Sequence, residues 1–161
     1  MSSEHRRYLL VEQAIGALVF NFVLNGVIAW LLFRHLETVP LWGQQSIAGD
    51  TIATAIILPL LTCLIVTRIA HGHVRAGRIP PLRWRHAALG WLPRHAFTRG
   101  LALAGLALAL FAPVTIAGLE AAGVADLRLW PFVLFKASFA AGAAAIVAPV
   151  VALLALLDGA R

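Results

Sequence analysis

The chain has 161 residues, of which 61% are hydrophobic and only 12% are charged, whereas an ordinary soluble domain is about half apolar and a quarter charged. This composition, with a mean hydropathy of +0.87, excludes an ordinary soluble fold and is typical of an integral membrane protein. The formal net charge of +6 is a feature of nucleic-acid-binding proteins as well. The arginines flank apolar blocks, however, where they orient membrane helices, so we expect no nucleic-acid partner.

Four apolar blocks are long enough to cross a bilayer, whose hydrocarbon core of about 30 Å needs roughly 20 helical residues. They span residues 8–33, 47–70, 101–119 and 131–157. Because a helix satisfies its own backbone hydrogen bonds in lipid, the sequence predicts an all-α fold. We expect an integral membrane four-helix bundle built from two transmembrane hairpins, with residues 1–161 forming a single membrane domain.

The first block follows two arginines, as the apolar part of a secretory signal would. It is too long for such a signal, however, and carries Glu12, Gln13, Asn21 and Asn25 within it. We therefore expect it to remain as a membrane anchor.

The distribution of basic residues predicts the orientation of the helices. Ten of the 13 Lys and Arg residues lie on the side that carries both ends of the chain and the connection between the second and third helices. By the positive-inside rule this side is cytoplasmic. The abundance of arginine and alanine suits a GC-rich bacterial genome, so we expect a multi-pass protein of the bacterial inner (plasma) membrane with both termini in the cytoplasm.

The connection of residues 71–99 contains a short segment with the pattern of an amphipathic helix. Trp84, Ala88 and Trp91 recur at three- and four-residue spacing, and Pro93 ends the run. The pattern predicts an interfacial helix on the cytoplasmic face, with apolar side chains toward the acyl chains and arginines toward anionic lipid headgroups. The expected headgroup contacts are Arg83, Arg85 and Arg94. A surface that binds a protein partner would leave the same pattern.

The two halves of the chain share a weak pattern. A Leu-Trp pair precedes the second and the fourth apolar blocks, at Trp42 and Trp130, and a proline lies within each block, at Pro59 and Pro149. Parallel repeats of this kind occur in transporters. The spacing from tryptophan to proline differs, being 17 residues in the first half and 19 in the second, and tryptophan also anchors at membrane interfaces in unrelated helices.

Small residues recur at spacing four in the last two blocks. The third block offers Gly100 with Ala104 and Gly105 with Ala109, and the fourth is rich in alanine. Such rows allow close approach of helix backbones in membranes. They predict a tight bundle and are also compatible with a homo-oligomer or with assembly into a larger membrane complex.

The polar side chains within the blocks are the candidate site. Each is costly in lipid unless it is paired or hydrated. Counting about 1.5 Å per residue from the outer helix ends places Asp50 and Lys136 level, with Asn25 and Asn21 deeper and Thr54 one turn from Asp50. We expect a substrate- or ion-binding cavity, open to the outer side, in which Asp50 and Lys136 pair. In the alternative, the amides and hydroxyls only join helices, Asp50 caps a helix and Lys136 extends to the interface.

Other chemistry has little support in the sequence. His71 and His73 are two residues apart and share no helix face, so we expect no metal site and no other cofactor. A nucleophile constellation and a phosphate-binding loop are likewise missing from the pattern, which makes an enzyme the less favoured class. The leading hypothesis is a small transporter-like or channel-like protein. The alternatives are a non-catalytic accessory or assembly subunit of a larger membrane complex and a membrane-embedded lipid-modifying enzyme.

Overall fold

The computed structural model describes residues 5, 7–80, 93 and 95–158. The predicted interfacial helix, with Arg83, Arg85 and Arg94, lies outside the described residues. The helical elements in chain order are η1 (Tyr8–Ile15), α2 (Gly16–Phe33), α3 (Ile47–Arg75), α4 (Ala96–Ala121) and α5 (Leu129–Asp158), with two short strands, β1 (Thr38–Pro40) and β2 (Asp126–Arg128). The π-helix η1 continues directly into α2, so that the two form one span.

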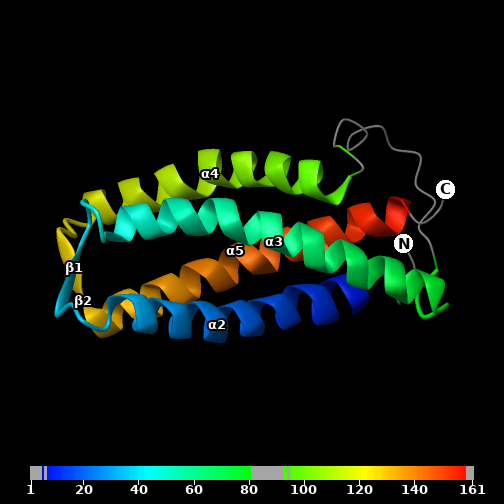
Figure 1. Ribbon diagram of the computed structural model, residues 1–161, viewed down its shortest axis with the longest axis horizontal. Coiled ribbons are helices and arrows are strands. Elements are labelled where there is room, and N and C mark those ends of the chain that lie inside the picture. Colours follow the sequence, from blue (N-terminus) through cyan, green and yellow to red (C-terminus); the bar gives the residue numbers. More distant parts are fainter. Residues whose placement is uncertain (1–4, 6, 81–92, 94, 159–161) are drawn as a thin grey trace.

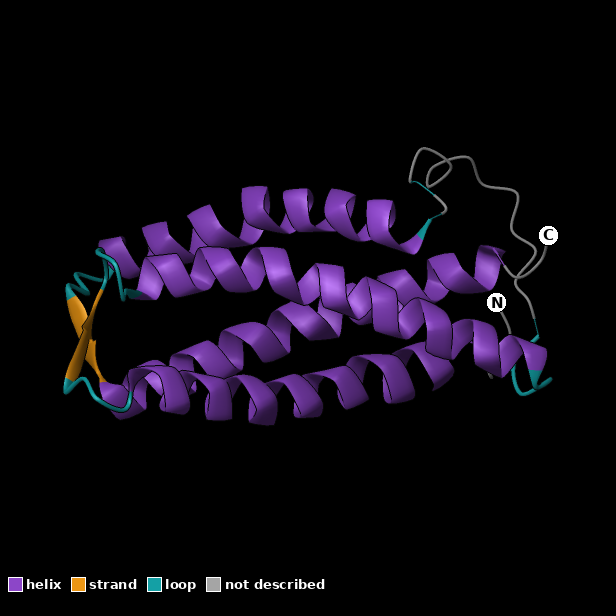
Figure 2. Ribbon diagram, in the orientation of Figure 1, coloured by secondary structure: helices purple, strands orange, loops and turns teal. Residues whose placement is uncertain are grey.

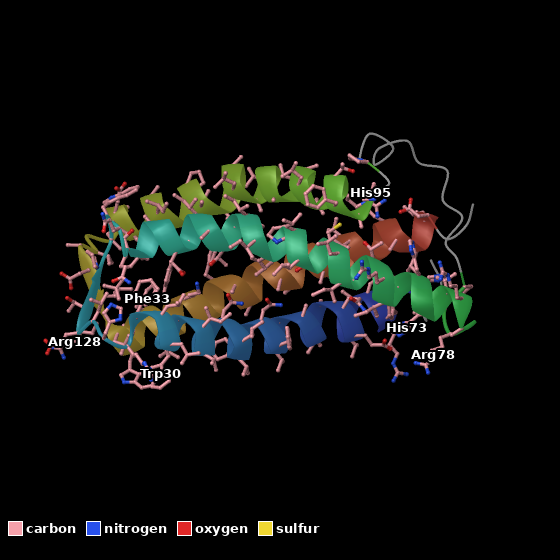
Figure 3. The ribbon with its side chains drawn as sticks, in the orientation of Figure 1. Trp30, Phe33, His73, Arg78, His95 and Arg128 are labelled. Atoms are coloured by element: carbon pink, nitrogen blue, oxygen red, sulfur yellow. The ribbon has the colours of Figure 1, made fainter. Side chains whose placement is uncertain are left out.

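These residues form four helices that are long and apolar enough to cross a membrane. The predicted all-α four-helix bundle is therefore confirmed. Residues with aromatic rings and charges mark both ends, as Figure 3 shows for Trp30 and Arg128 at one end and His73 at the other. The Arg34 guanidinium lies 5.2 Å from the centre of the Trp30 ring. Such aromatic and basic residues are typical of the lipid–water interface.

Local signals set the ends of the helices. The Ser46 side chain accepts a hydrogen bond of 3.1 Å from the backbone N–H of Gly49 and so caps α3. At the other end of α3, Gly77 has a positive φ of 67°, and Gly123 has a φ of 71° after α4. Glycine adopts this left-handed conformation readily because it has no Cβ atom. Both helices therefore end in a turn with a left-handed glycine just beyond the last helical residues. Asp50 lies in the first turn of α3 and is not its cap.

The two strands pair at one end of the bundle, which we call the sheet end; the opposite end is the far end (Figure 2). They are antiparallel, with Val39 opposite Leu127. Val39 is fully buried and packs with Phe33, Ile47 and Phe132. The sequence predicted two tight connections here but not their pairing. Together the strands and this apolar cluster tie the two hairpins to each other.

The helices do not close into a symmetrical square. Helices α3 and α5 pack against each other, α2 packs on α5, and α4 packs on α3, as the ribbon also shows (Figure 1). In the most apolar 18-residue stretch of α5, 61% of the residues are buried inside the bundle. In the corresponding stretch of the span formed by η1 and α2, only 6% are buried. Helix α5 is therefore the core of the bundle, whereas α2 exposes most of its surface to the surrounding lipid.

The structure supports the internal repeat. The offset from Tyr8 to Ala96, from Phe33 to Ala121 and from Thr38 to Asp126 is in each case 88 residues. Val39 and Leu127, which face each other in the sheet, have this same offset, so a two-fold pseudosymmetry axis passes between them. Each half is a span, a short strand and a second span. Trp42 and Trp130 obey the offset, while the two prolines do not.

Of the two small-residue rows predicted on α4, the row of Gly100 and Ala104 packs against α3. Gly100 and Ala104 are buried, whereas Gly105 is exposed. A Cβ atom at Gly100 would lie 3.0 Å from Leu60 Cδ1 and 3.2 Å from Cys63 Cβ; one at Gly105 would meet nothing within 4 Å. The close approach of α4 to α3 therefore depends on Gly100.

We expect Gly100→Ala to lower the free energy of unfolding by about 1–3 kcal/mol, because the added methyl group overpacks the helix contact. Thermal unfolding in mild detergent, followed by circular dichroism, measures the effect. Gly105→Ala is the matched control and should leave stability unchanged or slightly higher, because it fills open space in a helix. Equal stability of the two variants would contradict the assigned contact.

Candidate functional site

A groove runs between α2 and α3, with α5 as its floor, and has a volume of about 580 Å³. It forms because α2 and α3, although consecutive in the chain, both pack on α5. All five side chains predicted for the site line it: Asn21, Asn25, Asp50, Thr54 and Lys136. The structure thus brings the predicted polar residues of three helices into one groove.

An ion pair joins α3 to α5 in this groove. Lys136 Nζ donates a hydrogen bond to Asp50 Oδ1 and lies 3.3 Å from Thr54 Oγ1. The Lys136 side chain is 5% exposed and that of Asp50 is 11% exposed. The predicted pairing of the two residues is confirmed. The alternative in which Lys136 extends to the interface is wrong, because its ammonium turns inward to the carboxylate.

The two asparagines hydrogen-bond within their own helix rather than between helices. Asn21 Nδ2 donates to the carbonyl oxygen of Ala17 at 2.9 Å, and Asn25 Nδ2 donates to that of Asn21 at 3.1 Å. Within the described part of the chain, Asn25 Oδ1 and Asp50 Oδ2 accept no hydrogen bond. Both residues line the groove, so these acceptor oxygens are available to a ligand or to water.

The groove is longer than the sequence predicted. Besides the five expected residues, it is lined near the far end by Glu12 and Gln13 and, on α3, by Thr62. Gln13 is buried although it belongs to the helix that is otherwise most exposed. The sequence shows that Glu12 lies in the first apolar block, but the apolar pattern does not determine which helices pack together. The position of Glu12 in this groove could therefore not be predicted.

A second groove, which we call the counterpart groove, lies between α4 and α5 and has a volume of about 430 Å³. The offset of 88 residues relates its α5 side to the α3 side of the first groove, whereas different faces of α4 and α2 line the two grooves. With the offset of 88 residues, Ser138 stands where Asp50 stands in the first groove, and Gly142 stands in the place of Thr54. The second groove is lined mostly by apolar side chains and holds none with a formal charge. The charges are therefore specific to the first groove among these two.

A second ion pair lies at the far end. Arg99 Nη2 donates to Asp158 Oδ2 at 2.5 Å, and Arg99 Nε donates to the carbonyl oxygen of Pro93 at 3.0 Å. The Arg99 side chain is only 2% exposed. The pair joins the start of α4 to the end of α5 and closes the bundle at this end.

The histidines of the chain do not form a joint site in the described residues. The His73 ring meets the edge of the Tyr8 ring, with 5.6 Å between their centres, and His5 hydrogen-bonds to the carbonyl oxygen of Pro80. In the described ranges, no three His, Cys, Asp or Glu side chains come together as metal ligands would. Of the two grooves beside α5 described above, only the one between α2 and α3 holds charged and amide side chains.

Comparison with protein-family models, with curated proteins and with solved structures finds no match to this chain.

Proposed function

We propose that this protein is a small transporter-like membrane protein that binds its substrate in the groove between α2 and α3. The observation that carries the proposal is the Asp50–Lys136 pair. This pair lies with Thr54 in a groove between two otherwise apolar membrane-spanning helices. Ionisable groups are expensive inside a membrane and usually mark a pathway or a ligand site. The counterpart groove supports a functional origin, because it has Ser138 at the position equivalent to Asp50 and holds no charge.

The orientation of the protein belongs to the same proposal. The exposed Arg68, Arg75 and Arg78 lie at the far end, whereas the sheet end carries Arg34 and Arg128. With the positive-inside rule, we propose that the far end faces the cytoplasm of a bacterial cell. The Asp50–Lys136 pair would then lie toward the outer side of the inner membrane.

The proposal predicts that water reaches the middle of the groove. The chain has one cysteine, Cys63, which is buried, so Cys63→Ala gives a background for single-cysteine variants. In proteoliposomes, Asn25→Cys should react with a charged maleimide about tenfold faster than Val23→Cys, because the reactive thiolate forms in water and not in lipid. Val23 is the matched control: it lies at the same depth on α2, is 59% exposed and does not line the groove.

The labelling rates are followed by mass spectrometry of the intact protein. Rapid reaction of Asn25→Cys with slow reaction of Val23→Cys is the expected result. If both thiols react equally slowly, the groove is dry and the proposed substrate site is rejected.

A further inference from the structure

The edges of the groove between α2 and α3 are apolar and face lipid. Four groove-lining residues at spacing four form the edge on α2, and four more form the edge on α3; all eight are exposed. They are Phe20, Leu24, Ile28 and Leu32 on α2 and Ile57, Leu61, Ile65 and Ile69 on α3. Because α2 and α3 pack on α5 rather than on each other, the groove opens sideways into the bilayer between these two rows.

Behind the apolar edges, polar side chains occur along the whole groove. Glu12 and Gln13 lie near the far end, Asn21 and Asn25 follow on α2, and the ion pair lies near the sheet end. The groove-lining part of the first span, from Glu12 to Leu32, covers roughly 30 Å at about 1.5 Å per residue. This length matches the hydrocarbon core of a bilayer, which is about 30 Å thick. The groove is therefore long enough to cross the hydrocarbon core, with polar side chains near its far end, in its middle and, as the ion pair, near its sheet end.

A groove of this cross-section suits a molecule with a polar part and long apolar chains. The polar part can lie against the amide, hydroxyl and charged groups of the interior, while the chains pass between the apolar edges and stay in the lipid. A ligand that is polar throughout would place polar groups against these apolar edges and the lipid, and a fully apolar one would give no hydrogen-bond partner to the polar groups of the interior.

The charged residues in the groove indicate more closely which class of amphipathic ligand it can bind. The Asp50–Lys136 pair offers a carboxylate beside an ammonium, and Glu12 adds a second carboxylate near the far end. A zwitterionic headgroup carries a phosphate and an ammonium, and so can bind both members of the pair at once without leaving either charge uncompensated. The free acceptor oxygens of Asn25 and Asp50 suit the ammonium of phosphatidylethanolamine, which donates hydrogen bonds.

We propose that the groove is a track on which zwitterionic phospholipids such as phosphatidylethanolamine cross the membrane, headgroup in the groove and acyl chains in the bilayer. This inference rests on the proposed function and names the substrate class of the same site. The movement needs no covalent step. The counterpart groove between α4 and α5 has no charged lining and is not such a track.

The test uses proteoliposomes that contain phosphatidylethanolamine with a fluorophore on one acyl chain, to which dithionite is added from outside. Dithionite bleaches only the outer leaflet of protein-free vesicles. With the full chain present, we expect nearly all of the fluorescence to be lost, because lipids from the inner leaflet reach the outside. A trapped soluble fluorophore that stays unbleached shows that the vesicles do not leak.

Three variants locate the track. Asn25→Leu in the middle and Gln13→Leu near the far end should each slow the second bleaching phase roughly tenfold, as expected for the loss of a hydrogen bond to the passing headgroup. Ser138→Ala, which changes the counterpart groove at the position equivalent to Asp50, should leave the rate unchanged. Circular dichroism and gel filtration verify that each variant is folded.

Bleaching that stops at the outer leaflet with the unmodified chain would overturn the phospholipid track, and is the result expected if a helix of a partner protein fills the groove instead. Unchanged rates in both leucine variants, or an equal loss in Ser138→Ala, would overturn it as well. The maleimide experiment separates the two proposals: a reactive Asn25→Cys without lipid movement leaves a hydrated site for another substrate, whereas an unreactive one removes both.

Discussion

Replacement of Lys136 by methionine should destabilise the bundle strongly. Lys136 is 4% exposed, and its ammonium contacts Asp50 and Thr54 from the core helix α5. The substitution leaves the Asp50 carboxylate, whose side chain is only 11% exposed, without its cation, and the loss of one partner of a buried pair typically costs about 3–5 kcal/mol. We therefore expect the free energy of unfolding to fall by about this amount. Titration with sodium dodecyl sulfate in mild detergent, followed by circular dichroism, measures it.

A double variant serves as the control for this prediction. Asp50→Asn combined with Lys136→Met removes both charges and should recover most of the lost stability, because no uncompensated ion remains. Ser138→Ala, the change at the equivalent position of the other half, should have little effect. A double variant that is as unstable as Lys136→Met would mean that the packing of the lysine chain, and not the ion pair, stabilises this part of the bundle.

The fold could be predicted to the level of four helices because each apolar block matches the thickness of a bilayer. The strands could not, since β1 and β2 have three residues each and carry no alternating pattern long enough to read. Their pairing matters nonetheless, because it sets the two-fold relation between the hairpins. Trp42 and Trp130 pointed to that relation, but the differing proline positions obscured it.

The candidate site was predicted in part. Depth along each helix, counted from the sequence, placed Asp50 and Lys136 at one level, and the structure pairs them. The full length of the groove was missed. Consecutive elements usually pack together, whereas here α2 and α3 leave a gap over α5, and it is this gap that brings Glu12 and Gln13 onto the same surface as Asn25.

The two halves of the chain share their order of elements, but only the first half contributes an acidic residue to a charged groove. Both halves form a span, a strand and a second span, and both leave a groove beside α5. Only the first groove has an ion pair; at the positions equivalent to Asp50 and Thr54 the second has Ser138 and Gly142. Charges that the second groove lacks, and that are costly in lipid, are the strongest reason to propose a function for the first groove.

The buried arginine at the far end should be the second large contributor to stability. Arg99 joins the start of α4 to Asp158 at the end of α5 and to the backbone of Pro93. Arg99→Leu removes these charged hydrogen bonds and leaves Asp158, which is 25% exposed, with partial access to water. We expect the free energy of unfolding to fall by about 2–3 kcal/mol, less than for a fully buried pair.

The loss should also be local, because Arg99 anchors a helix that otherwise packs mainly on α3. Amide hydrogen exchange, measured by mass spectrometry, should rise at the start of α4 while α2 keeps its protection. Arg99→Lys is the matched control: it keeps the charge but not the planar set of donors, so we expect an intermediate loss. Arg99→Leu with unchanged stability, or with exchange raised equally in α2 and α4, would show that this ion pair does not hold α4 in place.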